Sequence, residues 1–234
     1  TCVQCLGCET ACPSGVPFEE LISTTRAVMS TESRPPLRMR LGLQLLGRPR
    51  LLRLGVRILA VLQRLGLVPR SGLLLPLGDN RRRSTPGGDV LLFTGCVMDA
   101  CQPEIHDAVE DVLVAGGRSV ERTGEAVGCC GALHGHAGLH GEAMRRAEVV
   151  MAALPGDRPI LVDSAGCGAA LKRYWGLLGT PAAATFSERV FDVHEWLAAN
   201  PELLPESSGP AGEPVVVQDP CHLRHAQGVH GAVR

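Results

Sequence analysis

The sequence predicts an α+β or α/β protein made of three consecutive parts: a small cysteine-rich helical module, a helical linker and a parallel βαβ domain. Three observations support this. Four cysteines crowd the first twelve residues, the stretch 33–78 carries nine arginines and no acidic residue, and four short apolar runs beyond residue 89 each lead into a cysteine loop. We place the parts at 1–32, 33–88 and 89–213, with 214–234 starting a further repeat of the last one.

The composition excludes several classes of protein. The chain has 234 residues, with 23 Lys and Arg against 24 Asp and Glu and a formal net charge of −1. Near-neutrality gives no general attraction to nucleic acid, so we expect no nucleic-acid partner. A hydrophobic share of 45% is that of a globular protein rather than a disordered one. No apolar run approaches the roughly 18 residues that a membrane-spanning helix needs.

The cysteines at the start of the chain have a diagnostic spacing. Cys2, Cys5, Cys8 and Cys12 are separated by two, two and three residues, and Pro13 follows. Thiols this close together cannot cross-link distant loops, which argues against a disulfide framework. Structural zinc sites prefer two CxxC pairs separated by a longer spacer. The spacing is instead the bacterial ferredoxin run, so we predict that these four cysteines bind [4Fe–4S] clusters.

The fourth cysteine of this run carries a further expectation. In modules with two clusters, the last cysteine of each run binds the other cluster. Cys12 would then serve a cluster whose other three ligands are outside the sequence. We therefore expect this sequence to be a fragment that lacks residues upstream.

The basic stretch contains a predicted amphipathic helix that begins at Pro49 and ends near Gly66. At 100° per residue its arginines gather within about 60°, beside an apolar face. Such a helix either lies on a membrane surface or an acidic partner, or packs on its own domain with a solvated arginine edge. A linker around Arg81–Arg83 ends near Gly88. The arginines are Arg50, Arg53, Arg57 and Arg64, and the apolar residues are Leu51, Leu54, Ile58, Leu62 and Leu65.

The rest of the chain alternates between strands, cysteine loops and helices. This alternation predicts parallel βαβ units with right-handed crossovers, whose loops meet at one edge of the sheet. Five cysteines in those loops are therefore expected to converge, with sulfur atoms roughly 6–8 Å apart if they bind one cluster. The predicted strands are 90–93, about 118–121, 159–162 and 214–217, and the predicted helices are about 103–115, 140–154, 169–178 and 188–199. The converging cysteines are Cys96, Cys129, Cys130, Cys167 and Cys221.

Other reactive residues receive plainer interpretations. Cys101 fits no ligand spacing and is expected to be a free thiol. The histidines near the cysteine loops are expected to be solvated or hydrogen-bonded, with metal binding as the alternative. No glycine-rich nucleotide fingerprint follows any predicted strand, so no flavin is expected on this chain. These histidines are His134, His136, His140, His222 and His225.

Four motifs carry a resemblance to a known family. The segments 93–96 (Phe-Thr-Gly-Cys), 128–133 (Gly-Cys-Cys-Gly-Ala-Leu), 164–168 (Ser-Ala-Gly-Cys-Gly) and 219–223 (Asp-Pro-Cys-His-Leu) resemble the cysteine-rich CCG domain. That domain is known from heterodisulfide reductase and from quinone-linked dehydrogenases. Together with the ferredoxin-like helical iron–sulfur module, the chain is similar to the iron–sulfur subunits of glycolate oxidase.

The resemblance assigns the cysteines to repeats. It places Cys96, Cys129, Cys130 and Cys167 in a first CCG repeat and lets Cys221 open a second, which the sequence truncates. The heterodisulfide reductase version closes its motif with CxxC, whereas this chain reads Cys-Gly-Ala-Ala from residue 167. The last ligand of that version is therefore absent here.

The resemblance also implies a function. It predicts an iron–sulfur electron-transfer subunit of a multisubunit glycolate oxidase, with two [4Fe–4S] clusters in the full-length protein and room for another cluster or metal at the CCG site. No catalytic residue is assigned to this chain, because the flavin would sit on partner flavoprotein subunits. Electrons would pass to a quinone-type acceptor, in the cytoplasm or at the inner face of the membrane, with peripheral contact through 34–70. The alternatives are a heterodisulfide reductase-like catalytic subunit, an iron–sulfur subunit of a lactate or glycerol-3-phosphate dehydrogenase, and a structural zinc protein.

Overall fold

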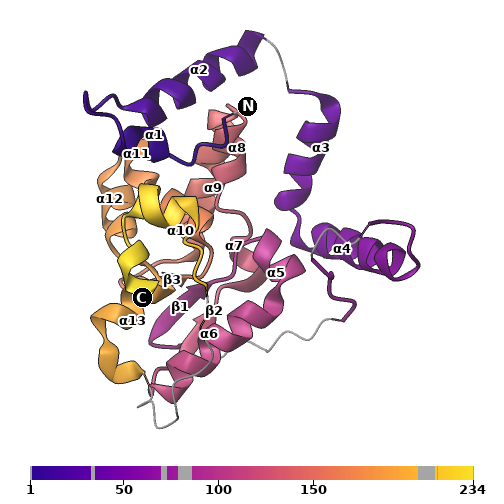
Figure 1. Ribbon diagram of the computed structural model, residues 1–234, viewed down its shortest axis with the longest axis vertical. Helices are drawn as coiled ribbons and strands as arrows, with labels where there is room; N and C mark the ends of the chain where they lie inside the picture. The colour runs from indigo at the N-terminus through magenta and orange to yellow at the C-terminus, as the bar shows by residue number, and fades with distance from the viewer. Residues whose placement is uncertain are drawn as a thin grey trace.

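Four short parallel strands form the centre of the fold (Figure 1). The structure is a computed structural model that describes residues 2–32, 35–69, 73–78, 86–204, 214 and 216–233. Every pairing in the sheet is parallel, and the strand order is β2-β1-β3-β4. This arrangement confirms the predicted mixed helical and α/β fold class. The strands are β1 (Val90–Phe93), β2 (Val120–Arg122), β3 (Ile160–Val162) and β4 (Val190–Asp192).

Both faces of the sheet are covered by helices, as the apolar character of β1 requires. All four side chains of β1 are buried. Leu91 and Phe93 pack in a core cluster with residues of α9, α11 and α12, while Val90 and Leu92 pack in a second cluster with residues of α6 and α13. The helices concerned are α6 (Pro103–Ala115), α9 (His140–Ala153), α11 (Tyr174–Leu178), α12 (Pro181–Glu188) and α13 (Val193–Ala199).

The cysteine-rich module at the N-terminus packs on the sheet domain far away in sequence. Figure 1 shows α1 (Gly7–Thr10) and α2 (Phe18–Glu32) at one end of the molecule, next to α8 (Ala132–His136) and α11. The Arg26 guanidinium donates hydrogen bonds of 2.9 Å to Gln4 Oε1 and to the His136 carbonyl oxygen. These bonds attach the cysteine run to α2 and attach α2 to the domain.

Gly138 allows this close docking, and its substitution gives a testable prediction. Its φ is +77°, and a Cβ there would lie 2.2 Å from the backbone oxygen of Arg26. Gly138→Ala should therefore push α2 off the domain and lower the free energy of unfolding by about 1–3 kcal/mol. Limited proteolysis should cut the segment 2–32 faster in this variant.

A matched control is available three residues away. Gly141 lies in α9 and a Cβ there would meet no atom within 4 Å, so Gly141→Ala should leave the cleavage rate unchanged. Equal cleavage rates in the Gly138→Ala variant and the unsubstituted protein would contradict the docking contact described here.

The basic stretch forms α3 (Leu37–Leu46) and α4 (Pro49–Arg64), which confirms the predicted helix. Helix α4 packs on the domain through a side that was expected neither from the membrane-surface interpretation nor from the packed-helix interpretation. Val56 and Ala60 are buried against Leu75 and Ala100, and the buried Gln63 amide accepts from the Leu75 N–H at 3.2 Å. The linker around Arg81–Arg83, as well as Arg34 and Arg70, lies outside the described residues.

The apolar face of α4 is exposed rather than buried. Leu54 and Ile58 are each 54% exposed and Leu65 is 66% exposed, whereas Arg53 is largely buried and forms an ion pair with Asp99 at 3.7 Å. One predicted alternative was a helix that packs its apolar face on the domain and leaves its arginines in solvent. That alternative is therefore wrong. Among the helices that the structure describes, none is both long and apolar enough to cross a membrane. We call the exposed residues Leu51, Leu54, Ile58, Val61 and Leu65 the α4 stripe.

Two strand predictions need correction. The fourth strand of the sheet is β4 at 190–192, inside the region predicted as a helix over 188–199, and only α13 of that region is helical. Conversely, no strand forms at the described residues of 214–217, and Val216 is 98% exposed. An apolar run forms a strand only where a neighbouring strand can hydrogen-bond to its backbone N–H and C=O groups. The place beside β3 that the run at 214–217 could have taken is occupied by β4.

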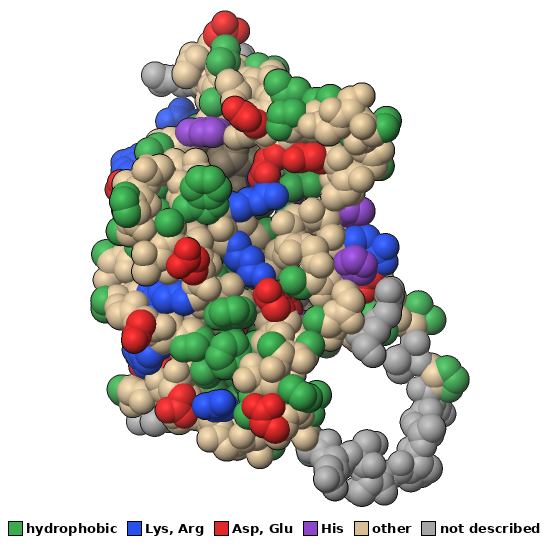
Figure 2. All heavy atoms as spheres, turned by 90° about the vertical axis from the view of Figure 1, so that its left-hand side faces the viewer, with side chains coloured by type: hydrophobic (Ala, Val, Ile, Leu, Met, Phe, Trp, Pro, Cys, Tyr) green, Lys and Arg blue, Asp and Glu red, His purple; other side chains and the backbone are tan. Residues whose placement is uncertain are grey.

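The remaining predicted elements are confirmed, with small shifts in their bounds. The helix expected over 169–178 is divided between α10 and α11. On the face shown in Figure 2, acidic and basic side chains of the described residues are interspersed. The other elements are α5 (Val97–Cys101), α7 (Gly124–Val127), α10 (Ala165–Lys172), the 3₁₀-helices η1 (Pro201–Leu203) and η3 (His230–Val233), and the π-helix η2 (His222–Gln227).

Candidate functional site

Four cysteines that are far apart in sequence meet at the carboxyl edge of the sheet. Cys96 follows β1, Cys129 and Cys130 lie in the loop between α7 and α8, and Cys167 lies in the first turn of α10. The Sγ atoms of Cys130 and Cys167 are 3.4 Å apart, and Cys129 is hydrogen-bonded to both Cys96 and Cys130. These hydrogen-bonded sulfurs are closer than the roughly 6–8 Å expected for ligands of one cluster. We call this set the cysteine cluster.

Hydrogen bonds inside the cysteine cluster shift the pKa values of its four thiols in opposite directions. The Cys130 thiol lowers the pKa of Cys129 and of Cys167, because the thiolate form of each accepts its hydrogen bond. The same contacts raise the pKa of Cys130, and the bond to Cys129 raises the pKa of Cys96. Thiolates are the form of cysteine that binds metal, so the lowered pKa values of Cys129 and Cys167 favour ligation.

Neighbouring groups support the charged sulfurs. The Gly131 N–H donates to Cys129 Sγ at 3.4 Å, and the buried His134 also hydrogen-bonds Cys129 and helps to lower its pKa. The Tyr174 hydroxyl donates to the Cys130 carbonyl at 2.8 Å and so fixes the loop. No sequence pattern indicated Tyr174. His134 was expected to be solvated or hydrogen-bonded, but its position four residues after Cys130 already indicated a place near the cysteine cluster.

A buried hydrogen-bonded pair, His106 and Asp163, lies beneath the loops of the cysteine cluster. Asp163 directly follows β3, and its Oδ2 lies 2.5 Å from Nδ1 of His106 on α6. Both side chains are at most 4% exposed. In a buried setting such a bond is costly to lose, so it ties α6 to the start of the loop that carries Cys167.

The cysteine run at the N-terminus has an unusual backbone. Gln4 and Leu6 flank Cys5 and adopt φ angles of 55° and 62°, which non-glycine residues rarely do. Both side chains are buried, while Cys2 and Cys8 are exposed. Left-handed residues turn successive N–H groups toward one side, an arrangement that binds anionic groups such as thiolate-ligated clusters. Such backbone conformations cost about 1–3 kcal/mol per residue and often occur at functional sites.

Backbone N–H groups also stabilise sulfur in this run. The Gln4 N–H donates to Cys2 Sγ at 3.3 Å. The N–H groups of Val16 and Ser14 lower the pKa of Cys12. Such hydrogen bonds to sulfur are typical of iron–sulfur loops.

The cysteine sulfurs therefore fit a centre of a thiophilic metal, but their geometry does not fit a single metal ion. Among the described residues, no group of three or more Cys, His, Asp or Glu side chains surrounds a point that could hold a single metal ion. Both cysteine groups offer sulfur ligands and N–H donors, the set that an iron–sulfur cluster uses. Cys221 is exposed just before η2, and within the described residues it is not among the sulfurs in contact.

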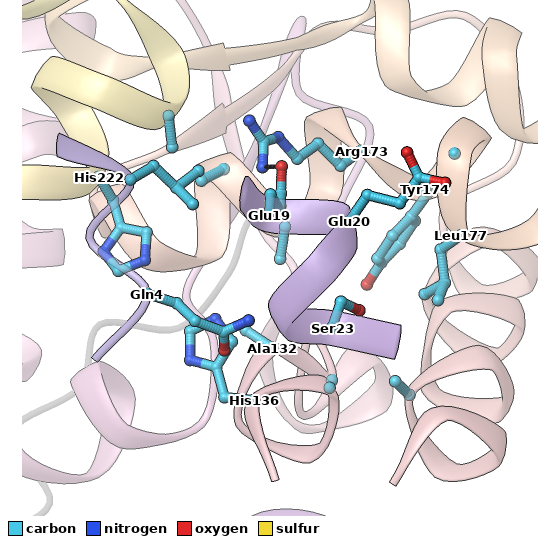
Figure 3. A pocket seen from close by; sticks show the side chains of 18 of the residues that line it. Gln4, Glu19, Glu20, Ser23, Ala132, His136, Arg173, Tyr174, Leu177 and His222 are labelled. Atoms are coloured by element: carbon cyan, nitrogen blue, oxygen red, sulfur yellow. Dashed lines mark ion pairs between the residues drawn. The ribbon is translucent and has the colours of Figure 1, made fainter. Parts of the chain in front are cut away.

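A cavity of about 670 Å³ lies between the cysteine run and the cysteine cluster (Figure 3). Gln4 and Glu9 of the N-terminal module line one side, and Cys130 and Gly131 line another. Figure 3 shows Ser23 and Glu20 of α2, together with Tyr174 and Leu177, pointing into the same space. The cavity exists because α2 docks on the domain, so its residues come from segments more than a hundred positions apart.

The charged side chains that line the cavity are Glu9, Glu19, Glu20 and Arg173. Arg173, between α10 and α11, pairs with Glu19 of α2, as the dashed line in Figure 3 marks. The rings of His136 and His222 stack with centroids 5.9 Å apart and an angle of 15° between their planes. Burial lowers the pKa of both imidazoles, with the charge of Arg173 adding to the effect on His222.

The C-terminal segment lines another side of the cavity through His222 and Ala226, and it contacts the end of α1. Thr10 Oγ1 lies 2.9 Å from Nδ1 of His225 in η2, and the Gln227 amide donates to the Ala165 carbonyl at 3.0 Å. The C-terminal segment thus bridges the cysteine run and α10, which places His222 next to the N-terminal module.

Comparisons with known proteins agree with these features. A family model described as a cysteine-rich domain, CCG, matches residues 90–172. The chain is 31% identical to the glycolate oxidase iron-sulfur subunit of Escherichia coli (strain K12), across 99% of this chain and 60% of that protein. It is 27% identical to a probable glycolate oxidase iron-sulfur subunit of Bacillus subtilis (strain 168), across 96% of this chain and 59% of that protein.

A third relative comes from a different enzyme. The chain is 31% identical to a subunit of the fumarate reductase (CoM/CoB) of Methanothermobacter marburgensis, across 68% of this chain and 29% of that protein. The chain thus spans about 60% of the length of the first two relatives. No solved structure gives a significant match.

Proposed function

The chain carries a cysteine-rich CCG domain and is homologous to glycolate oxidase iron–sulfur subunits, and from this premise we propose that it is the electron-transfer subunit of a glycolate oxidase complex. The complex would oxidise glycolate on a flavin held by partner flavoprotein subunits. This chain would pass the electrons to a quinone-type acceptor.

The observation that carries the proposal is the meeting of four sulfurs from three separate loops at one sheet edge. Buried cysteines that serve only packing have no reason to bring their sulfur atoms into contact with one another. We assign Cys96, Cys129, Cys130 and Cys167 as the ligands of a metal centre in the first CCG repeat, and Cys221 to the second.

The N-terminal module would hold the second kind of centre. Cys2, Cys5 and Cys8 would bind one [4Fe–4S] cluster and Cys12 the other of the two in the full-length protein. Such a cluster supplies one-electron transfer with little rearrangement. The residues of the chain exclude water, donate N–H groups to sulfur and hold the two cysteine groups on either side of one cavity. We propose that the N-terminal iron–sulfur module covers 1–32, the helical linker 33–88, the first CCG domain 89–213 and the start of the second CCG repeat 214–234.

The test is anaerobic purification of the whole complex followed by addition of glycolate. We expect flavoprotein subunits to co-purify and electron paramagnetic resonance signals of reduced iron–sulfur clusters to appear with glycolate. Signals that appear with lactate or glycerol 3-phosphate instead would move the assignment to those dehydrogenases. A chain that contains zinc and no iron would overturn it.

One relative favours a second candidate function. The methanogen protein is named as part of a CoM/CoB-linked fumarate reductase, and the Sγ atoms of Cys130 and Cys167 are in contact. Those two facts fit a subunit that reacts with thiols or disulfides. Reduction of an added disulfide to two thiols by the isolated chain, with a chemically reduced viologen as the electron donor and no flavoprotein subunits, would favour this candidate over electron transfer to a quinone.

The α4 stripe suggests where the complex meets the cell membrane. The surrounding stretch 33–78 carries nine arginines and no acidic residue, and the stripe itself is exposed. A helix with an apolar face and basic flanks binds the surface of anionic bilayers. We therefore assign the chain a cytoplasmic location with peripheral contact to the inner face of the membrane through 34–70.

Flotation with vesicles tests the membrane contact. Leu54→Glu with Ile58→Glu should reduce binding to phosphatidylglycerol-containing vesicles at least about tenfold, because two exposed apolar side chains that would enter the bilayer are lost. Val149 on α9 is also half exposed, and Val149→Glu is the matched control that should bind normally. If the double variant binds vesicles normally but loses the flavoprotein subunits, the stripe is a partner interface.

A further inference from the structure

We propose that the cavity between the cysteine run and the cysteine cluster binds the quinone-type acceptor as an uncharged ring, held between the N-terminal module and the CCG domain. This inference rests on the proposed function and names the place and chemistry of the acceptor site. Three features carry it: what the cavity touches, how large it is, and which groups line it.

The cavity touches both candidate metal centres. Gln4 and Leu6, which flank Cys5, line one wall, and Cys130 with its neighbour Gly131 lines another. A molecule in this space would contact the backbone of both cysteine groups. An electron acceptor gains from such a position, because either centre could then deliver electrons to it directly.

Its size and shape fit a planar ring. The volume of about 670 Å³ lies in the usual range of small-molecule sites, about 300–1,000 Å³. The flat imidazoles of His136 and His222 lie nearly parallel, and Figure 3 shows Gln4 close to both. Flat walls and small neighbours such as Ala132 and Ala170 suit an aromatic ring. Trp175 lines the cavity and is 61% exposed, so the cavity reaches the protein surface.

The charges of the lining exclude a carboxylate substrate. Glu9, Glu19 and Glu20 contribute three acidic groups, against the single guanidinium of Arg173, which is already paired with Glu19. An anion such as glycolate would be repelled. A quinone carries no charge, and its two carbonyl oxygens can accept hydrogen bonds from imidazole and amide N–H groups.

Reduction of a quinone in this cavity needs electrons from the partner flavoprotein. A quinone takes up two electrons and two protons, so that both C=O groups become C–OH groups. The electrons come from the reduced flavin of the partner flavoprotein, which oxidises the 2-hydroxy acid. The protons come from water at the open mouth of the cavity.

Photolabelling of the intact complex tests the site. An azido-naphthoquinone should attach to peptides that contain 132–136 and 173–177, and an excess of menadione should prevent it. Ala132→Phe fills the cavity and should reduce labelling at least about tenfold, as should His136→Leu. His194 lies on α13 outside the cavity lining, so His194→Leu is the matched control and should label normally.

The outcomes separate this inference from the proposed function. Labelling that maps elsewhere, resists menadione or survives Ala132→Phe would overturn the cavity as the quinone site, even if glycolate still reduces the iron–sulfur signals. Competition by glycolate instead of menadione would also overturn it, because the cavity would then bind the acid. Loss of the glycolate signals with menadione-sensitive labelling intact would leave the cavity as a quinone site in a complex with a different electron donor.

Discussion

Replacing Cys129 by serine is expected to remove the metal of the CCG domain completely. Cys129 contacts Cys96 and Cys130, accepts hydrogen bonds from His134 and the Gly131 N–H, and has its pKa lowered by those contacts. A serine hydroxyl is almost the same size but is a poor replacement for a soft thiolate. Iron and acid-labile sulfide in the purified complex should fall by the whole content of that centre.

Cys101 provides the control for this change. It lies at the end of α5, partly buried, and belongs to a different apolar cluster. Cys101→Ser makes the same chemical change and should leave iron and sulfide unchanged. Equal iron content in the Cys129→Ser and Cys101→Ser complexes would show that the sulfur contacts at the sheet edge serve packing only.

The second large effect is expected at the N-terminal run. Cys5→Ser should abolish one cubane signal in electron paramagnetic resonance and remove about four irons per chain, because Cys5 lies in the middle of the strained loop. The buried, left-handed Gln4 and Leu6 on either side remain, so the loop should keep its shape. Circular dichroism should therefore match that of the unsubstituted protein.

The result for Cys5→Ser has a clear contrary outcome. An undiminished content of iron and sulfide, with an unchanged cluster spectrum, would remove the ferredoxin-type assignment of the run. The control is again Cys101→Ser, which should keep the iron and sulfide content and the cluster spectrum of the unsubstituted protein.

Much of the fold could be predicted because its signals are local. The run at 90–93 is apolar throughout, so a buried strand was the only reasonable interpretation, and the helix at 103–115 has a clear apolar face. The strand at 190–192 was missed because three residues before a helix give too short a pattern to separate from it. The run at 214–217 misled because its valines have β propensity but lack a neighbouring strand among the described residues.

The site was predictable only where topology alone brings residues together. Parallel strands send their loops to one edge, which accounts for the meeting of Cys96, Cys130 and Cys167. The cavity was not predictable, because it depends on the docking of α2 against α8. Its key partners, such as Glu19 with Arg173, carry no shared sequence pattern. The side of α4 that packs was also hidden, since Val56 and Ala60 are no more apolar than the exposed leucines.

The long-range docking of α2 has a consequence for how the protein is made. The Ser30 hydroxyl donates to the Gly138 carbonyl across 108 positions, so the N-terminal module emerges from the ribosome well before its docking surface exists. At about 5–20 residues per second, that delay is roughly 5–20 s. If the run binds clusters as proposed, its four cysteines are still undocked during this interval, when iron and sulfide could be inserted. Loading before docking would let the cell fill a centre that the finished protein partly covers.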